Sequence, residues 1–97
     1  GDGAPNALLA QTINNLATLD EERGDLAAAE AGYRRSLAWR EQSLPADSLP
    51  VARARHNLAR ALLRQGRLDE AADLVAAARR VREAAQPVAA PERLATQ

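Results

Sequence analysis

The chain has 97 residues, enough for one domain, and its 13 acidic and 13 basic residues give a net charge of zero. This balance predicts no overall attraction to nucleic acid or to an anionic membrane, and the absence of Cys excludes disulfides, thiolate metal sites and a thiol nucleophile. Twenty-four residues are Ala and the only aromatic residues are Tyr33 and Trp39, a composition that favours helices over sheets.

The first predicted unit, about residues 6–43, is a helical hairpin. Its first helix carries apolar residues mostly at steps of three and four: Leu9, Ile13, Leu16, Ala17 and Leu19. Gly24 interrupts this helix, and Asp25 is placed as the N-cap of the next one. The apolar stripe of the second helix consists of Leu26, Ala29, Tyr33 and Leu37.

A connector over residues 44–49 leads to a second predicted hairpin, about residues 50–85. Asp47 or Ser48 can cap a helix whose first turn tolerates Pro50. The two apolar stripes are Ala54, Leu58, Ala61 and Leu62, then Leu68, Ala71, Leu74, Val75, Ala78 and Val81, with Gly66 between them. Such short breaks favour antiparallel helices. Residues 86–97 contain two Pro and are expected to form a C-terminal segment that ends in a short helical turn or two.

The two units are copies of one repeat, related by an offset of 42 residues. The offset carries Asn15-Leu16-Ala17 onto Asn57-Leu58-Ala59 and Gly24 onto Gly66. Further identities in the same register pair Leu26 with Leu68, Ala29 with Ala71, Arg40-Glu41 with Arg82-Glu83, and Pro45 with Pro87.

These residues resemble tetratricopeptide repeats, most closely the longer-repeat variety found in kinesin light chains and in many bacterial regulatory proteins. The stretches that carry the resemblance are NNLATLDEERGDLAAAEAGYRRSLAWREQSLPADSLPVA and HNLARALLRQGRLDEAADLVAAARRVRE, and together it covers about residues 12–85. The resemblance implies an all-α fold, with two tandem antiparallel helix-turn-helix hairpins as a right-handed solenoid fragment. Asp20 and Arg79 depart from the family pattern, since a large apolar residue is expected at each.

The resemblance also implies a concave groove that binds extended peptides and is lined by the first helix of each unit. Carried over by position, its residues are Gln11, Asn14, Asn15, Thr18, Glu22, Arg53, His56, Asn57, Arg60 and Arg64. The residues themselves agree in part, because four of them fall at helical spacing on the side of their helix away from the apolar stripe: Arg53, Asn57, Arg60 and Arg64. Asn side chains can pair with a peptide backbone, and Arg can hold carboxylates bidentately.

Each of these sites has a second interpretation. The Arg-rich face can bind an acidic or C-terminal peptide segment, or it can simply be solvated. Asn15 and Asn57 can clamp a peptide backbone or form hydrogen bonds within the hairpin. His56 is the only His and is expected to be a groove or surface residue and not a metal ligand. Tyr33 and Trp39 are expected to pack between the hairpins.

The sequence therefore predicts a protein–protein interaction module, with self-association in a larger regulatory or scaffold protein as the alternative. No phosphate loop, metal-ligand spacing or nucleophile elbow is present, so we expect no enzymatic activity and no cofactor. Stacked repeats generally need about three units for a continuous core. The two units therefore suggest an excised array, a dimer or a capping role for the C-terminal segment. The start at Gly1 without Met also suggests a fragment, and a cytoplasmic location is expected.

Overall fold

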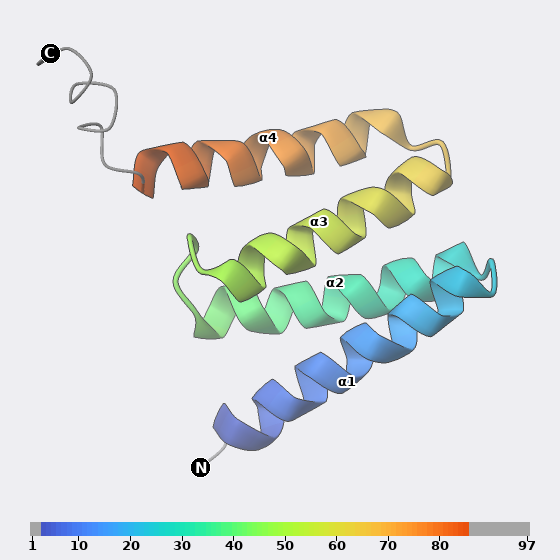
Figure 1. Ribbon diagram of the computed structural model, residues 1–97, viewed down its shortest axis with the longest axis horizontal. Helices are drawn as coiled ribbons and strands as arrows, with labels where there is room; N and C mark the ends of the chain where they lie inside the picture. The colour runs from blue at the N-terminus through green and yellow to red at the C-terminus, as the bar shows by residue number, and fades with distance from the viewer. Residues whose placement is uncertain (1–2, 86–97) are drawn as a thin grey trace, which may run out of the picture.

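The computed structural model describes residues 3–85, which form four helices and the turns between them. The helices are α1 (Gly3–Glu22), α2 (Leu26–Ser43), α3 (Leu49–Arg64) and α4 (Leu68–Ala85). Each helix packs antiparallel to the one before it, so that α1 and α2 form one hairpin and α3 and α4 the next (Figure 1). The prediction of an all-α fold built from two hairpins is confirmed. The expected C-terminal segment lies outside the described residues.

The turn within each hairpin has the same geometry, as the 42-residue repeat predicts. Gly24 has a φ of +85° and Gly66 one of +80°, a conformation that L side chains rarely adopt. The amide of Asp25 donates to the carbonyl of Asp20 (2.8 Å), and that of Arg67 donates to the carbonyl of Leu62 (2.9 Å). These bonds satisfy carbonyls that each helix end leaves open, so α2 and α4 turn back along their predecessors.

The predicted N-caps of α2 and α3 are both found, but only the cap of α2 makes the expected side-chain hydrogen bond. Asp25 is the N-cap of α2, and its Oδ1 accepts a hydrogen bond from the amide of Ala28 (3.3 Å). Ser48 is the N-cap of α3, but its side chain makes no capping bond there, and Pro50 stands in the first turn. The fixed φ of proline and its missing N–H both suit that position.

The hydrophobic core lies mainly where α2 meets α3. Tyr33 is fully buried on α2, and Leu58 and Leu62 are buried on α3. The core consists of Ala17, Ala29, Tyr33, Leu37, Val51, Ala54, Leu58, Ala59, Ala61, Leu62 and Ala71. The apolar stripe predicted for α3 is confirmed in full. In α2 it holds for Ala29, Tyr33 and Leu37, while Leu26 is half-buried.

The stripe predicted for α1 is wrong in its leucines. Leu9, Leu16 and Leu19 are 53%, 56% and 48% exposed, while Ala10, Ala17 and Glu21 occupy the buried side. A Cβ added at Gly32 of α2 would lie only 2.9 Å from the Cβ of Ala17, so the two helices approach too closely for leucines to fit between them. The leucines of α1 therefore lie outside the close contact with α2 and stay exposed.

Two further packing predictions are also corrected. On α4, Ala71 is buried but Leu68 and Val75 are 60% and 43% exposed, because no helix within residues 3–85 covers the outer side of α4. Tyr33 lies between the hairpins as expected. Trp39 instead lies beside Ala10 and Ile13 of α1, within the first hairpin. None of the helices in residues 3–85 has both the length and the apolar character that a membrane crossing requires.

Candidate functional site

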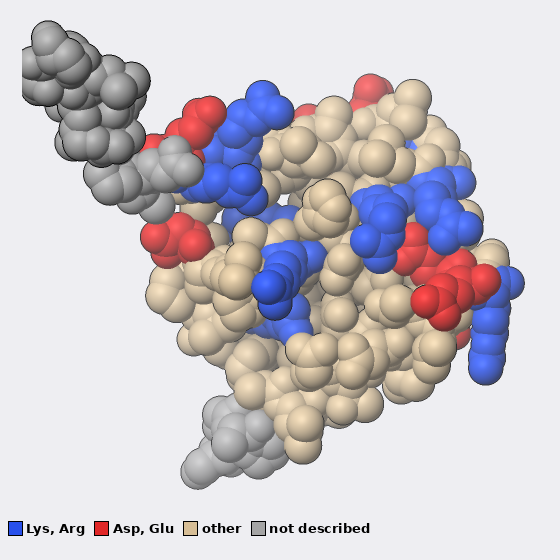
Figure 2. Space-filling view, in the orientation of Figure 1, with Lys and Arg blue, Asp and Glu red and all other residues tan. Residues whose placement is uncertain are grey.

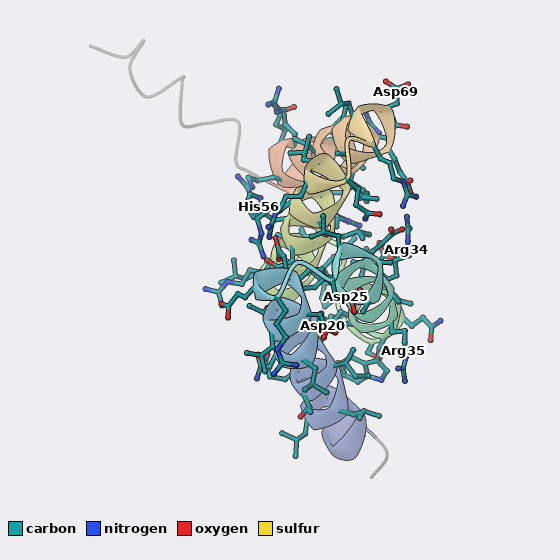
Figure 3. The ribbon with its side chains drawn as sticks, turned by 90° about the vertical axis from the view of Figure 1, so that its right-hand side faces the viewer. Asp20, Asp25, Arg34, Arg35, His56 and Asp69 are labelled. Carbon is teal, nitrogen blue, oxygen red and sulfur yellow. The ribbon has the colours of Figure 1, made fainter. Side chains whose placement is uncertain are left out.

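The ten predicted site residues all lie on α1 or α3, the first helix of each hairpin. We call this set the polar face: Gln11, Asn14, Asn15, Thr18, Glu22, Arg53, His56, Asn57, Arg60 and Arg64. His56 points to one side of the molecule, and Arg34 and Arg35 of α2 point to the opposite side (Figure 3). The members of the polar face are exposed or half-buried, so their polar atoms can reach solvent or a ligand.

The polar face is held together by amides that bond to each other. Asn57 of α3 donates from Nδ2 to Oδ1 of Asn14 on α1 (3.2 Å), and Gln11 donates to Oδ1 of Asn15 (3.0 Å). The Asn57 bond therefore joins the two hairpins, whereas one of the two sequence interpretations placed its hydrogen bonds within a single hairpin. Each amide retains further donors and acceptors after these bonds, because an Asn or Gln amide can make about four.

A buried carboxylate, Glu21, lies beneath one end of the polar face. Glu21 is 4% exposed and accepts hydrogen bonds from Nε (2.9 Å) and Nη2 (2.8 Å) of Arg60, from the hydroxyl of Tyr33 (2.8 Å) and from Nη1 of Arg64 (3.2 Å). Hydrogen bonding from Arg60 is the main cause that lowers the pKa of Glu21 to about 2, against the opposing effect of burial. We call these four residues the Glu21 cluster.

The Glu21 cluster changes what Arg60 and Arg64 can do. Arg60 also bonds to the side chain of Asn57 (3.3 Å), and its guanidinium lies 6.0 Å from the centroid of the Tyr33 ring. The hydrogen bonds to Glu21 raise the pKa of Arg60 above its ordinary value. Both arginines pair with the one carboxylate of Glu21, so part of their positive charge is already compensated within the chain.

The opposite end of the polar face is basic. Arg53 and His56 line a pocket of about 270 Å³ with Asn57 and with Arg82 of α4. A second pocket of about 220 Å³, between α3 and α4, shares His56 and Arg82 and adds Arg55 and Arg79. Of these arginines, only Arg55 has an acidic partner among residues 3–85, Glu41 at 3.3 Å. Figure 2 shows basic side chains over the left-hand ends of α3 and α4 with acidic ones beside them, and a second mixture of basic and acidic side chains at the right. We call Arg53, His56 and Arg82 the basic end.

Arg40 of α2 adds a buried positive charge near the basic end. It is 8% exposed and donates to Oε1 of Gln11 (3.0 Å) and to the carbonyl of Pro50 (3.3 Å). Burial, followed by repulsion from the charge of Arg53, lowers the pKa of Arg40. Among residues 3–85, no carboxylate forms an ion pair with Arg40, so its charge adds to the positive potential at this end.

A separate set of ion pairs joins the hairpins on the other side of the molecule. Glu30 of α2 accepts from Gln65 (2.9 Å) and pairs with Arg34 and Arg67, while Glu70 of α4 pairs with the same two arginines. Most of these side chains are more than a third exposed, so solvent screens the pairs and their contribution to stability is small. They orient the hairpins and leave the polar face open.

Sequence reasoning missed Glu21, Arg40 and Arg82. A signal for Glu21 was present, because Ala10, Ala17 and Glu21 follow at steps of seven and four, which puts the carboxylate on the buried side of α1. Arg40 and Arg82 are equivalent in the 42-residue repeat, but no pattern in the sequence shows that one is buried and the other lines a pocket.

No group of His, Asp and Glu side chains in residues 3–85 is arranged to hold a metal ion. A family model described as tetratricopeptide repeat matches residues 8–84, a range that includes all ten residues of the polar face and most of both hairpins. The match is to the family in general, and the long-repeat variety stays a prediction. Comparison with curated proteins and with solved structures gave no match.

Proposed function

Because the chain belongs to the tetratricopeptide repeat family, whose members generally mediate protein–protein interaction, we propose that it binds an extended segment of a partner protein along its polar face. The observation that carries this proposal is the set of amides on α1 and α3, where the bond between Asn57 and Asn14 joins the two helices. An extended chain that binds to a helix-lined surface needs partners there for the backbone N–H and C=O groups that it turns away from water.

The amides of the polar face are suited to that task. Gln11 and Asn15 are exposed, and each amide that bonds to a neighbour is held in a fixed orientation with donors or acceptors left over. An ordered amide loses little side-chain freedom when it binds, so less of the binding energy is spent on ordering it. Backbone recognition of this kind tolerates many partner sequences, and specificity then depends on the charged ends of the face.

The basic end favours an acidic side chain or a terminal carboxylate in the bound segment. Arg53 and His56 are exposed and share a pocket with Arg82, and Arg40 lies close enough for the charge of Arg53 to affect its pKa. An anion in this pocket would compensate charges that no carboxylate among residues 3–85 neutralises. Arg60 and Arg64 contribute less, because Glu21 already pairs with both.

Fluorescence anisotropy with labelled peptides of about twelve residues tests the proposal. Three peptides share one extended, Ala- and Ser-based backbone and carry four Glu, four Gln or four Lys at the same positions. We expect the Glu peptide to bind most tightly, the Gln peptide more weakly and the Lys peptide not at all. The affinity for the Glu peptide should fall as salt is added, since screening weakens exposed charge pairs.

Two variants separate binding at the basic end from a general charge effect. Arg53→Glu should weaken binding of the Glu peptide about tenfold, which corresponds to the loss of one charged hydrogen-bonding partner. Arg35→Glu changes the net charge equally but lies on the other side of the molecule, and it should leave the affinity unchanged. Equal binding of all three peptides, or equal effects of the two variants, would refute the acidic-ligand proposal. Failure of every peptide to bind would refute the polar face as a peptide site.

A further inference from the structure

The two ends of the helical stack expose apolar surfaces that lie outside the polar face. On α4, an open groove of about 330 Å³ is lined by Leu63, Leu68, Ala71, Ala72, Val75, Ala76 and Arg79, which we call the α4 face. On α1, the exposed leucines Leu9, Leu16 and Leu19 form the α1 face. Exposed apolar surface at both ends of a small domain calls for a physical explanation.

The α1 face repeats the surface that α3 uses to pack on α2. The 42-residue offset carries Leu9, Leu16 and Leu19 onto Val51, Leu58 and Ala61. Those three residues of α3 are 0%, 1% and 0% exposed and belong to the core between the hairpins. The exposed leucines of α1 thus occupy positions that are fully buried in the second unit, where a preceding helix covers them.

The α4 face likewise repeats the surface that α2 turns toward the second hairpin. The same offset carries Leu26, Glu30, Tyr33 and Arg34 of α2 onto Leu68, Ala72, Val75 and Ala76 of α4. In α2 this surface contacts the second hairpin: Tyr33 bonds to Arg60 (3.2 Å), Glu30 bonds to Gln65 (2.9 Å), and Arg34 pairs with Glu70. On α4, Ala replaces the two charged positions, and only a smaller, apolar surface remains.

From these two correspondences we propose that the α4 face binds the α1 face of a second copy of this chain. The joint has the register of the α2–α3 contact within the chain, with the leucines of α1 in the places of Val51, Leu58 and Ala61. It differs from that contact in chemistry, because Ala72, Ala76 and Leu63 replace Glu30, Arg34 and Glu21. The joint is therefore apolar and holds none of the ion pairs that link the two hairpins internally.

Arg79 is the one position of the α4 face at which a charged residue replaces an apolar residue of its template. It replaces Leu37, which is buried in the core, and its charged head must extend to the rim of the joint while its methylene stem covers apolar surface. Arg79 weakens the joint relative to the α2–α3 contact. We therefore expect the copies to dissociate when the protein is diluted and to associate when it is concentrated.

The geometry of this joint is head to tail. Because the α4 face and the α1 face are different surfaces, each bound copy leaves one of each uncovered, and chains longer than a dimer follow unless the stack closes into a ring. The inference goes beyond the proposed function, since neither face includes a residue of the polar face. A chain that failed to bind any peptide could still stack, and the reverse also holds.

Light scattering coupled to size-exclusion chromatography, over a concentration series of the full chain, tests the proposal. We expect the average mass to rise with concentration and to pass that of a dimer. Leu16→Glu blocks the α1 face and Val75→Glu blocks the α4 face, and each variant alone should be a monomer. Mixed in equal amounts they should form a dimer and nothing larger, because one intact face of each kind remains.

A matched control and a strengthening variant complete the test. Leu49 is 59% exposed but belongs to neither face, so Leu49→Glu should leave the mass unchanged, and circular dichroism confirms that each variant is folded. Arg79→Leu should lower the dissociation constant about tenfold by burying a leucine, and Leu16→Glu should abolish that gain. A monomer at every concentration, a dimer of either blocked variant alone, or an equal loss in Leu49→Glu would each overturn the proposal.

Discussion

Arg60 donates two hydrogen bonds to the carboxylate of Glu21, at 2.9 and 2.8 Å, and the two residues belong to different hairpins. The carboxylate is almost fully buried, whereas the side chain of Arg60 is 42% exposed. Desolvation therefore weighs on the acid much more than on the base, and the acid depends on its partners to remain charged. This asymmetry makes Glu21 the member of the pair whose charge depends most on the contact between the hairpins.

We expect Glu21→Gln to lower the free energy of unfolding by about 2 kcal/mol, the range for hydrogen bonds to a buried charged group. The amide keeps the shape of the side chain but loses the charge that Arg60, Arg64 and Tyr33 share. Urea unfolding followed by circular dichroism measures the change. Glu22→Gln is the control, because Glu22 is exposed and its replacement should alter stability by less than about 0.5 kcal/mol. An equal effect of the two variants would contradict the central role of Glu21.

The lowered pKa of Glu21 predicts how stability depends on pH. In the folded chain the pKa is about 2, and the ordinary value is 4.5. The contribution of Glu21 is therefore fully present above about pH 5 and is lost as the pH falls through the range between the two pKa values. Glu30 and Glu70 also have lowered pKa values, so the wild-type curve alone does not isolate Glu21.

The difference between wild type and Glu21→Gln isolates the effect of Glu21. We expect the two free energies of unfolding to differ most above about pH 5 and to converge as the pH approaches 2, because the protonated carboxyl resembles the amide. Urea unfolding at pH 7, 4, 3 and 2 provides the measurement. A difference that stays constant across this range would show that the charge of Glu21 is not what stabilises the contact.

The fold was predictable from the sequence because its signals are local or repeated. Gly24 and Gly66 mark the turns by themselves, and the 42-residue offset requires any structure of one unit to recur in the other. The buried side of α1 was not predictable in the same way. Hydrophobicity favours the leucines, but the close approach of Ala17 to Gly32 excludes them from the contact, and such a pairing of small residues depends on a distance in space.

The candidate site was predictable only as a set of positions. Helical spacing places Arg53, Asn57 and Arg60 on one side of α3, but it does not show which of these cations is already neutralised. Arg60 meets Glu21 across 39 residues of sequence, and Arg53 meets Arg82 in a pocket between two helices. Long-range partners of this kind depend on the packing of the hairpins. They distinguish Arg60, whose charge Glu21 shares, from Arg53, which lines an open pocket, although the two residues are of the same type.

The turn at Gly66 gives a prediction about backbone strain alone. Gly66 has a φ of +80°, and a Cβ added there would meet no atom within 4 Å. Gly66→Ala should therefore lower the free energy of unfolding by about 1 kcal/mol through the left-handed backbone conformation. Gly66→Asn should cost less, because Asn tolerates this conformation better. Thermal unfolding of both variants measures the order, and an equal cost would point to a lost contact instead of strain.

The contact between Gly32 and Ala17 predicts that Gly32→Ala changes the free energy of unfolding in a direction that depends on the residue at position 17. Gly32→Ala adds a good helix former, worth about 1 kcal/mol by propensity, yet its Cβ would lie 2.9 Å from that of Ala17. We expect the overlap to prevail and the free energy of unfolding to fall by about 1–2 kcal/mol. In an Ala17→Gly background the overlap is gone, so the same substitution should stabilise the chain.

Ala27→Gly, on the exposed side of α2, should show no such coupling. Additive effects of Gly32→Ala and Ala17→Gly in urea unfolding would mean that α1 and α2 can separate at little cost, and the exposed leucines of α1 would then need another explanation.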